Sequence, residues 1–152
     1  MDKIARFLAL LSAGLLAGAF LAAFFTVVPT WYEVPREVHF TYRVALMRHN
    51  AIYMQIVMGL GILTPAWWAY TMRNSPSARI CAILASLMAL TSLLVTRFGN
   101  VPINRMIQTW SAIAPPANYT EQLQRWTVFH DIRTATAAAC FVFVVIADLL
   151  LS

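Results

Sequence analysis

Four long segments of the chain are predominantly apolar, although the last is interrupted by His130, Asp131 and Arg133 near its start and by Asp148 near its end. The four segments cover residues 4–28, 51–72, 79–98 and 120–151. About 20 apolar residues in a helix cross the hydrocarbon core of a bilayer, because a helix rises about 1.5 Å per residue. The sequence therefore predicts an all-α fold, an integral membrane four-helix bundle that forms a single domain over residues 1–152.

The composition supports a lipid environment. Of the 152 residues, 61% are hydrophobic and only 11% are charged, against roughly 45–50% and about 25% in soluble domains. This hydrophobicity excludes intrinsic disorder. The net charge is +5, but the basic residues lie at the ends of the apolar segments, as the flanks of membrane helices do. We therefore expect membrane lipid as a partner and no nucleic acid.

Four spans place both termini on one side of the membrane, and two long connections on the other. These connections are predicted at Pro29–Asn50 and Asn100–Thr127, because Pro29 disfavours helical geometry in the residue before it. The connection side carries seven basic residues and the terminal side four, which by itself would make the connections cytoplasmic. Lys3 and Arg6 at the first helix argue for cytoplasmic termini, and this is the orientation that we predict.

The few polar groups are unevenly distributed. All three histidines and four of the six acidic residues fall on the side of the long connections: His39, His49, His130, Glu33, Glu37, Glu121 and Asp131. The terminal side is nearly bare of reactive groups. We therefore expect any chemistry at the mouth that the long connections form.

The first candidate stretch follows the third span. Pro102 suits the first turn of a helix, and Asn100 is placed to cap it. Asn104 and Arg105 would then lie on neighbouring turns. The alternative is an interfacial helix whose arginines contact lipid phosphate.

The second candidate stretch begins the fourth span. Trp126, His130 and Arg133 are spaced i, i+4 and i+7 and share one face of a helix. A histidine and an arginine inside an apolar span are costly unless they meet a polar cavity or partners. A neutral histidine beside a fixed cation suits a general base. The alternative is an interfacial histidine beside an arginine that extends to the lipid surface.

A third cluster offers weak candidates for metal ligands, namely Glu33, Glu37 and His39, with His130 opposite. Their spacing matches no zinc or iron motif, and Pro35 interrupts the helical face. A solvated loop that covers the mouth is the alternative.

The polar and aromatic residues of the second half follow one order, Asn100-x-Pro102-x-Asn104, then Trp110, then Trp126-x3-His130-x2-Arg133. On a four-span chain of this length, the order resembles the anthrone oxygenase-like membrane proteins, whose bacterial members are mostly labelled a domain of unknown function. The resemblance implies oxidation of anthrones to anthraquinones by molecular oxygen without a known cofactor. It points to these site residues: Asn100, Asn104, Trp110, Trp126 and Arg133.

A mechanism follows if this chemistry carries over. His130 would take a proton from the acidic carbon of a flat, apolar phenolic or anthrone-like substrate. Donor groups would stabilise the enolate in a site of low dielectric, and they are Arg133, Arg105, Asn100 and Asn104. Trp110 and Trp126 would stack on the substrate, which arrives through the lipid.

Two other classes of function stay open. One is a metal- or haem-dependent membrane oxidoreductase that uses His39, His130 and Glu33 or Glu37. The other is a non-catalytic small subunit or scaffold of a larger membrane complex, with a homo-oligomer or complex partner. The expected location is a bacterial plasma membrane. The substrate and any metal are not fixed by the sequence.

Overall fold

The computed structural model describes residues 2–151, and within this range it contains four long helical passes and no strand. The first pass joins α1 (Asp2–Ala22), a π-helical turn η1 (Ala23–Val27) and α2 (Val28–Glu33). The second is α3 (Arg36–Thr71). The third joins α4 (Pro76–Val95), a second π-helical turn η2 (Thr96–Asn100) and α5 (Val101–Ile107), and the fourth is α6 (Tyr119–Leu149).

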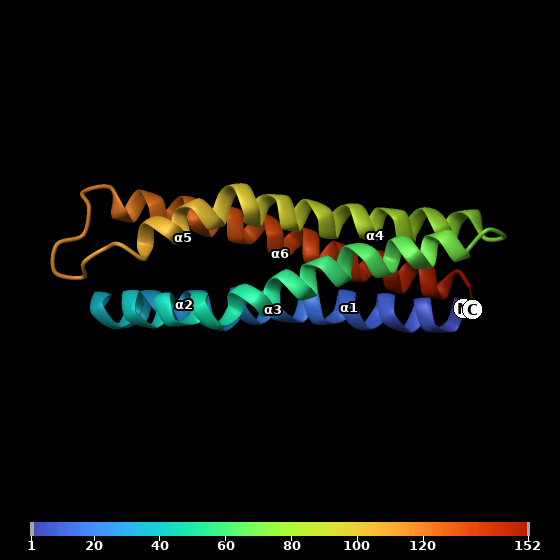
Figure 1. Cartoon of the computed structure of the whole chain (residues 1–152), viewed down its shortest axis with the longest axis horizontal. Helices are drawn as coiled ribbons and strands as arrows, with labels where there is room; N and C mark the ends of the chain where they lie inside the picture. Colours follow the sequence, from blue (N-terminus) through green and yellow to red (C-terminus); the bar gives the residue numbers. More distant parts are fainter. Residues whose placement is uncertain (1, 152) are drawn as a thin grey trace.

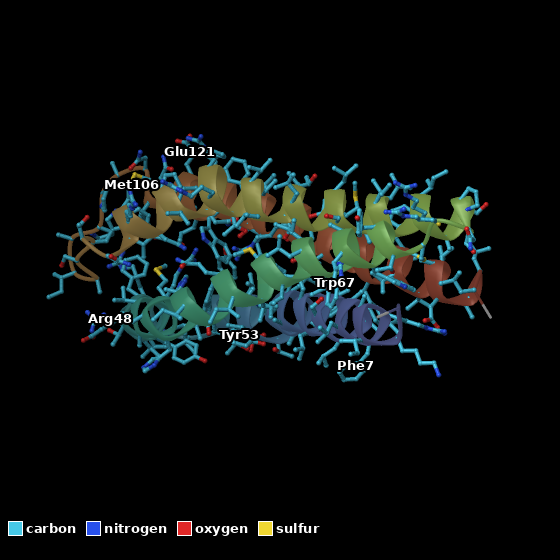
Figure 2. All side chains as sticks on the ribbon, turned by 45° about the vertical axis from the view of Figure 1, so that its right-hand side comes forward. Phe7, Arg48, Tyr53, Trp67, Met106 and Glu121 are labelled. Carbon is cyan, nitrogen blue, oxygen red and sulfur yellow. The ribbon has the colours of Figure 1, made fainter. Side chains whose placement is uncertain are left out.

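The passes form an elongated bundle in which the start of α1 and the end of α6 lie together (Figure 1). All four passes are long and apolar enough to cross a membrane. The predicted all-α membrane bundle is thus confirmed. Large apolar side chains such as Phe7 and Tyr53 are exposed on the outside of the bundle (Figure 2), where hydrocarbon would surround them.

The bundle is longer than the membrane is thick. The 36 residues of α3 extend over about 54 Å, whereas the hydrocarbon core measures about 30 Å. We take the basic residues at the end of the termini, Lys3, Arg6, Arg73 and Arg79, as the flank that marks the membrane surface. The surplus length therefore projects at the opposite end, where the loop 108–118 connects α5 to α6 (Figure 1).

The first predicted connection, Pro29–Asn50, is wrong in detail. Only Val34 and Pro35 interrupt the helices there, and Val34 is extended, with φ −105° and ψ 157°, because it precedes a proline. The remaining residues lengthen α2 and α3. Hydropathy marks only the part of a helix that lies in hydrocarbon, so it gives no sign that the helices continue through this connection. The second connection is likewise shortened to residues 108–118.

Each π-helical turn lies two residues before a proline. Pro29 follows η1 and Pro102 follows η2. A proline within an α-helix lacks an N–H and clashes with the carbonyl four residues earlier, and a π-turn lengthens this interval by one residue. Pro29 was expected to end the first helix, but the π-turn lets the helix continue to Glu33.

Small side chains bring the helices together within the membrane. Fully buried alanines line α1 and α4, namely Ala5, Ala9 and Ala13, and Ala78, Ala82, Ala85 and Ala89. Such residues allow close approach of backbones in lipid, where packing replaces the hydrophobic effect. The hydroxyls of Ser12 and Thr64, 2.6 Å apart, hydrogen-bond α1 to α3, and an ion pair between Arg6 and Asp148 joins α1 to α6.

Candidate functional site

Two asparagines hold the Trp126 residue of α6 in place. The Asn100 amide nitrogen donates to the Trp126 carbonyl oxygen at 3.0 Å, and the indole N–H of Trp126 donates to Asn104 Oδ1 at 2.7 Å. Both amides are thus directed at the protein. Each amide nitrogen keeps at least one N–H that these bonds do not use, so their expected part in stabilising an enolate stays a prediction. Both bonds hold Trp126 against the third pass.

His130 lies directly beneath Trp126 and beside Arg133. The His130 ring stacks on the indole with centroids 5.1 Å apart and an interplanar angle of 12°. Arg133 places Nε 3.2 Å and Nη2 3.1 Å from His130 Nδ1. A guanidinium has only donors, so Nδ1 accepts and the proton of the neutral imidazole is on Nε2. The remaining ring nitrogen is therefore a donor, which does not suit the predicted role of a base.

Trp126, His130 and Arg133 form one Trp–His–Arg set, and a second set of these three residue types lies on the first two passes. Trp31 of α2 stacks on His39 of α3, with centroids 5.5 Å apart and an angle of 16°. Arg43, one turn along α3, places Nη1 3.4 Å from His39 Nε2. The sequence prediction had His39 only as a weak metal ligand and gave no role to Trp31 or Arg43.

The two sets meet at Trp126. The guanidinium carbon of Arg43 lies 4.1 Å from the centre of the Trp126 ring and 4.4 Å from that of Trp31. That of Arg133 lies 5.3 Å from Trp126 and 4.8 Å from Phe20. Neither arginine has an acidic partner among the residues that the structure describes. Two like charges inside a low-dielectric bundle repel each other, and a nearby anion would offset this repulsion.

Several buried polar atoms of this cluster lack a hydrogen-bond partner. They are four donors and one acceptor: Trp31 Nε1, Arg43 Nε, Arg43 Nη2, His130 Nε2 and Asn100 Oδ1. Leaving a buried donor unsatisfied costs about 1–3 kcal/mol, and such groups in a native fold call for a ligand, an ion or water. The site therefore offers several free N–H donors in one place.

The aromatic rings form a continuous row from the projecting end into the membrane. The successive centroid distances are 5.7 Å from Trp110 to Phe40, 5.5 Å to His39, 5.5 Å to Trp31, 5.4 Å to Trp126 and 5.1 Å to His130. Rings at these separations are in contact with one another, so the row is a packed aromatic core.

The structure thus gathers most of the predicted site residues. Those that meet in one cluster are Asn100, Asn104, Trp126, His130 and Arg133. Trp110 is linked to the cluster through Phe40. Arg105 is exposed on α5, because it lies on the outer face of that helix.

The weak metal candidates do not converge. Glu33 and Glu37 are exposed, whereas His39 is buried. Within residues 2–151, no three His, Cys, Asp or Glu side chains are close enough to share an ion. The physical reason is that Pro35 starts α3, whose helical phase turns Glu37 outward and His39 inward.

Comparison with known families agrees with the motif order. The model of a family described as anthrone oxygenase matches residues 44–143. The chain belongs to the anthrone oxygenase family. No curated protein and no solved structure matches it. The family relationship indicates a membrane oxygenase-like function, and the matched range contains the Trp126 set but begins just after Arg43.

Proposed function

We propose that this family member oxidises a flat, apolar phenolic substrate of the anthrone type with molecular oxygen, through an enolate held between Arg43 and Arg133. The observation that carries the proposal is the pair of guanidinium groups that share the Trp126 ring at 4.1 and 5.3 Å. They have no acidic partner in the described part of the chain. In many enzymes, hydrogen-bond donors that are already positioned for a developing negative charge make the largest single contribution to the rate enhancement.

The reaction balances without an external reductant. The substrate carbon between two rings loses a proton to water, which leaves the enolate. The enolate gives one electron to O2, and the resulting carbon radical and superoxide combine into a peroxide at the same carbon. After protonation, the hydroperoxide loses water and its C–H carbon becomes a carbonyl. One O2 is consumed, and one quinone and one water are formed.

The side chains of the cluster divide the work. The free N–H groups of Trp31, Arg43 and His130 donate to the enolate oxygen, and the indole edges of Trp31 and Trp126 border the flat rings. His130 thus acts as a hydrogen-bond donor instead of the base that the sequence suggested. Asn104 is a positioning residue that acts through Trp126.

The location of the cluster fits an apolar substrate. His130 packs against Phe20 and Phe24 of the first pass, with ring centroids 6.3 and 6.4 Å away, so the inner end of the site adjoins the lipid-facing helices. We place the protein in a bacterial plasma membrane with cytoplasmic termini. A substrate dissolved in the bilayer would then reach the cluster without crossing water.

The test measures O2 consumption and quinone absorbance with anthrone and purified protein in detergent. Arg43→Gln and Arg133→Gln keep much of the side-chain volume but remove the charge. We expect each to lower kcat by about 100- to 1,000-fold, the loss typical of one oxyanion donor. Arg125→Gln removes an exposed arginine on α6 and should leave turnover unchanged.

Three results would overturn the proposal. Wild-type protein that inserts and folds but does not oxidise anthrone would favour the non-catalytic subunit. Full turnover in Arg43→Gln and Arg133→Gln would remove the guanidinium groups from the mechanism. A stoichiometric metal in the purified active protein, with activity lost on chelation, would favour the metal-dependent oxidoreductase.

A further inference from the structure

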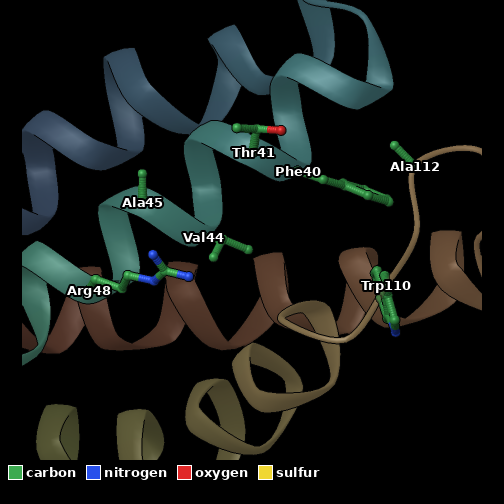
Figure 3. A pocket seen from close by; sticks show the side chains of 7 residues that line it. All are labelled: Phe40, Thr41, Val44, Ala45, Arg48, Trp110 and Ala112. Carbon is green, nitrogen blue, oxygen red and sulfur yellow. The ribbon is translucent and has the colours of Figure 1, made fainter.

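A second, open cavity lies beside α3 at the projecting end of the bundle. Its volume is about 370 Å³, and its walls include Phe40, Val44, Ala45, Arg48 and Trp110 (Figure 3). This volume falls in the range of about 300–1,000 Å³ that small-molecule sites occupy. None of the roles described for the buried cluster requires this cavity.

One aromatic ring separates the cavity from the buried cluster. Phe40 lines the cavity, and its ring centroid is 5.7 Å from that of Trp110 on the cavity side. On the other side the same ring lies 5.5 Å from His39, which is hydrogen-bonded to Arg43. A flat molecule in the cavity is therefore separated from the first arginine of the site by two rings, those of Phe40 and His39.

The two ends of the cavity differ in chemistry. Arg48 lies at one end, while Trp110 and Ala112 lie at the other, with Phe40 next to them (Figure 3). The cation suits a carboxylate or a phenolate, and the two rings suit a planar aromatic body. A lipid phosphate would satisfy Arg48 but would leave the aromatic end without a flat partner.

We infer that this cavity is a docking site, separate from the bilayer route of neutral substrates, from which a planar aromatic anion passes Phe40 into the Trp126 cluster, with Arg48 binding its acidic substituent. The choice of ligand class rests on the proposed function, whereas the cavity and its charge do not. Substrates with an acidic group at one end should therefore be preferred over neutral ones.

A thiol-protection experiment tests occupancy without any turnover. Ala45→Cys is introduced into a Cys81→Ala/Cys140→Ala background, because Ala45 is exposed and lines the cavity. The probe is anthraquinone-2-carboxylate, which is already oxidised, and its neutral control is anthraquinone-2-carboxamide. Glu121→Cys, exposed on α6 outside the cavity, is the matched control position.

We expect the carboxylate to slow modification of the thiol introduced at position 45 and to leave that at position 121 unaffected. The carboxamide should protect about fivefold more weakly, the effect of one partly solvated ion pair. Adding Arg48→Gln should abolish this difference. Equal protection by both probes, or none, would contradict the inference. Protection by short-chain phosphatidylglycerol but not by the aromatic carboxylate would show a lipid site instead and refute it.

Kinetics separate this inference from the proposed function. With an anthrone that carries a carboxylate, Arg48→Gln should raise KM about fivefold and leave kcat unchanged, whereas unsubstituted anthrone should show no change. If wild-type protein oxidises no anthrone, the proposed function fails, but thiol protection still decides the docking site. If turnover is normal and Arg48→Gln changes neither KM nor protection, only the docking site fails.

Discussion

Gly99 is the position where one added methyl group should disturb the site most. This glycine is buried in η2, next to Asn100. A Cβ atom there would lie 2.5 Å from Cγ, 2.7 Å from Cδ1 and 2.9 Å from Cδ2 of Phe129. Cγ is the root of the ring and is not moved by rotation about χ2, so Gly99→Ala must either change the χ1 rotamer of Phe129 or push α6 from η2.

The expected change in the free energy of unfolding on Gly99→Ala is the difference between two opposing contributions. Replacing a helical glycine by alanine gains up to about 1 kcal/mol of helix propensity. Overpacking a core typically costs about 1–3 kcal/mol, and three contacts under 3.0 Å place this site at the upper end. We expect Gly99→Ala to lower the free energy of unfolding by about 1–2 kcal/mol.

Gly18→Ala is the matched control, because a Cβ at Gly18 would have no atom within 4 Å. It should be neutral or slightly stabilising. Thermal unfolding in detergent measures both variants, with about 2–4 °C expected per kcal/mol for a chain of this size. In a Phe129→Ala background the clash is absent, so adding Gly99→Ala should cost less there than in the wild-type chain. If Gly99→Ala is as stable as Gly18→Ala, the close packing of η2 on α6 is not what the structure indicates.

Two other predictions concern hydrogen bonds between helices. Trp126→Phe keeps a stacking ring but loses the 2.7 Å bond to Asn104. A double-mutant cycle with Asn104→Ala should give a coupling energy of about 1 kcal/mol in the free energy of unfolding, and Trp126→Phe should also lower kcat. A coupling energy of zero would contradict the positioning role of Asn104. Thr64→Val removes the 2.6 Å bond to Ser12 but leaves Ser12 its bond to the Ala9 carbonyl oxygen at 3.3 Å. The loss should therefore be near 0.6 kcal/mol, the average for such bonds in membranes, and a loss of several kcal/mol in a denaturation series would refute this.

The fold was largely predictable, because lipid imposes a simple rule on sequence. Apolar stretches of sufficient length must be helical, since every backbone group needs an internal partner. That rule gave the number of passes and the common side of the termini. It gave no information about helix beyond the hydrocarbon, and this is why Pro29–Asn50 was expected to be a connection although α2 and α3 occupy most of it.

This single error accounts for the half of the site that the sequence prediction missed. Trp31, His39 and Arg43 all lie within the segment that was taken for a loop. In a loop, spacing carries no meaning, so the i, i+4 relation of His39 and Arg43 could not be used. The same relation between Trp126 and His130 was recognised because α6 was expected to be helical there.

Had α3 been predicted as a helix, its periodicity would also have shown which of its arginines face the bundle interior and which face outward. Residues four apart differ by about 40° around a helix, whereas residues five apart differ by about 140°. His39 and Arg43 therefore share the inner face, and Arg48 must point elsewhere. The structure agrees: Arg43 is 1% exposed between two indoles, and Arg48 is exposed at the outer cavity. The same helix thus carries one cation suited to the reacting anion and another suited to its arrival.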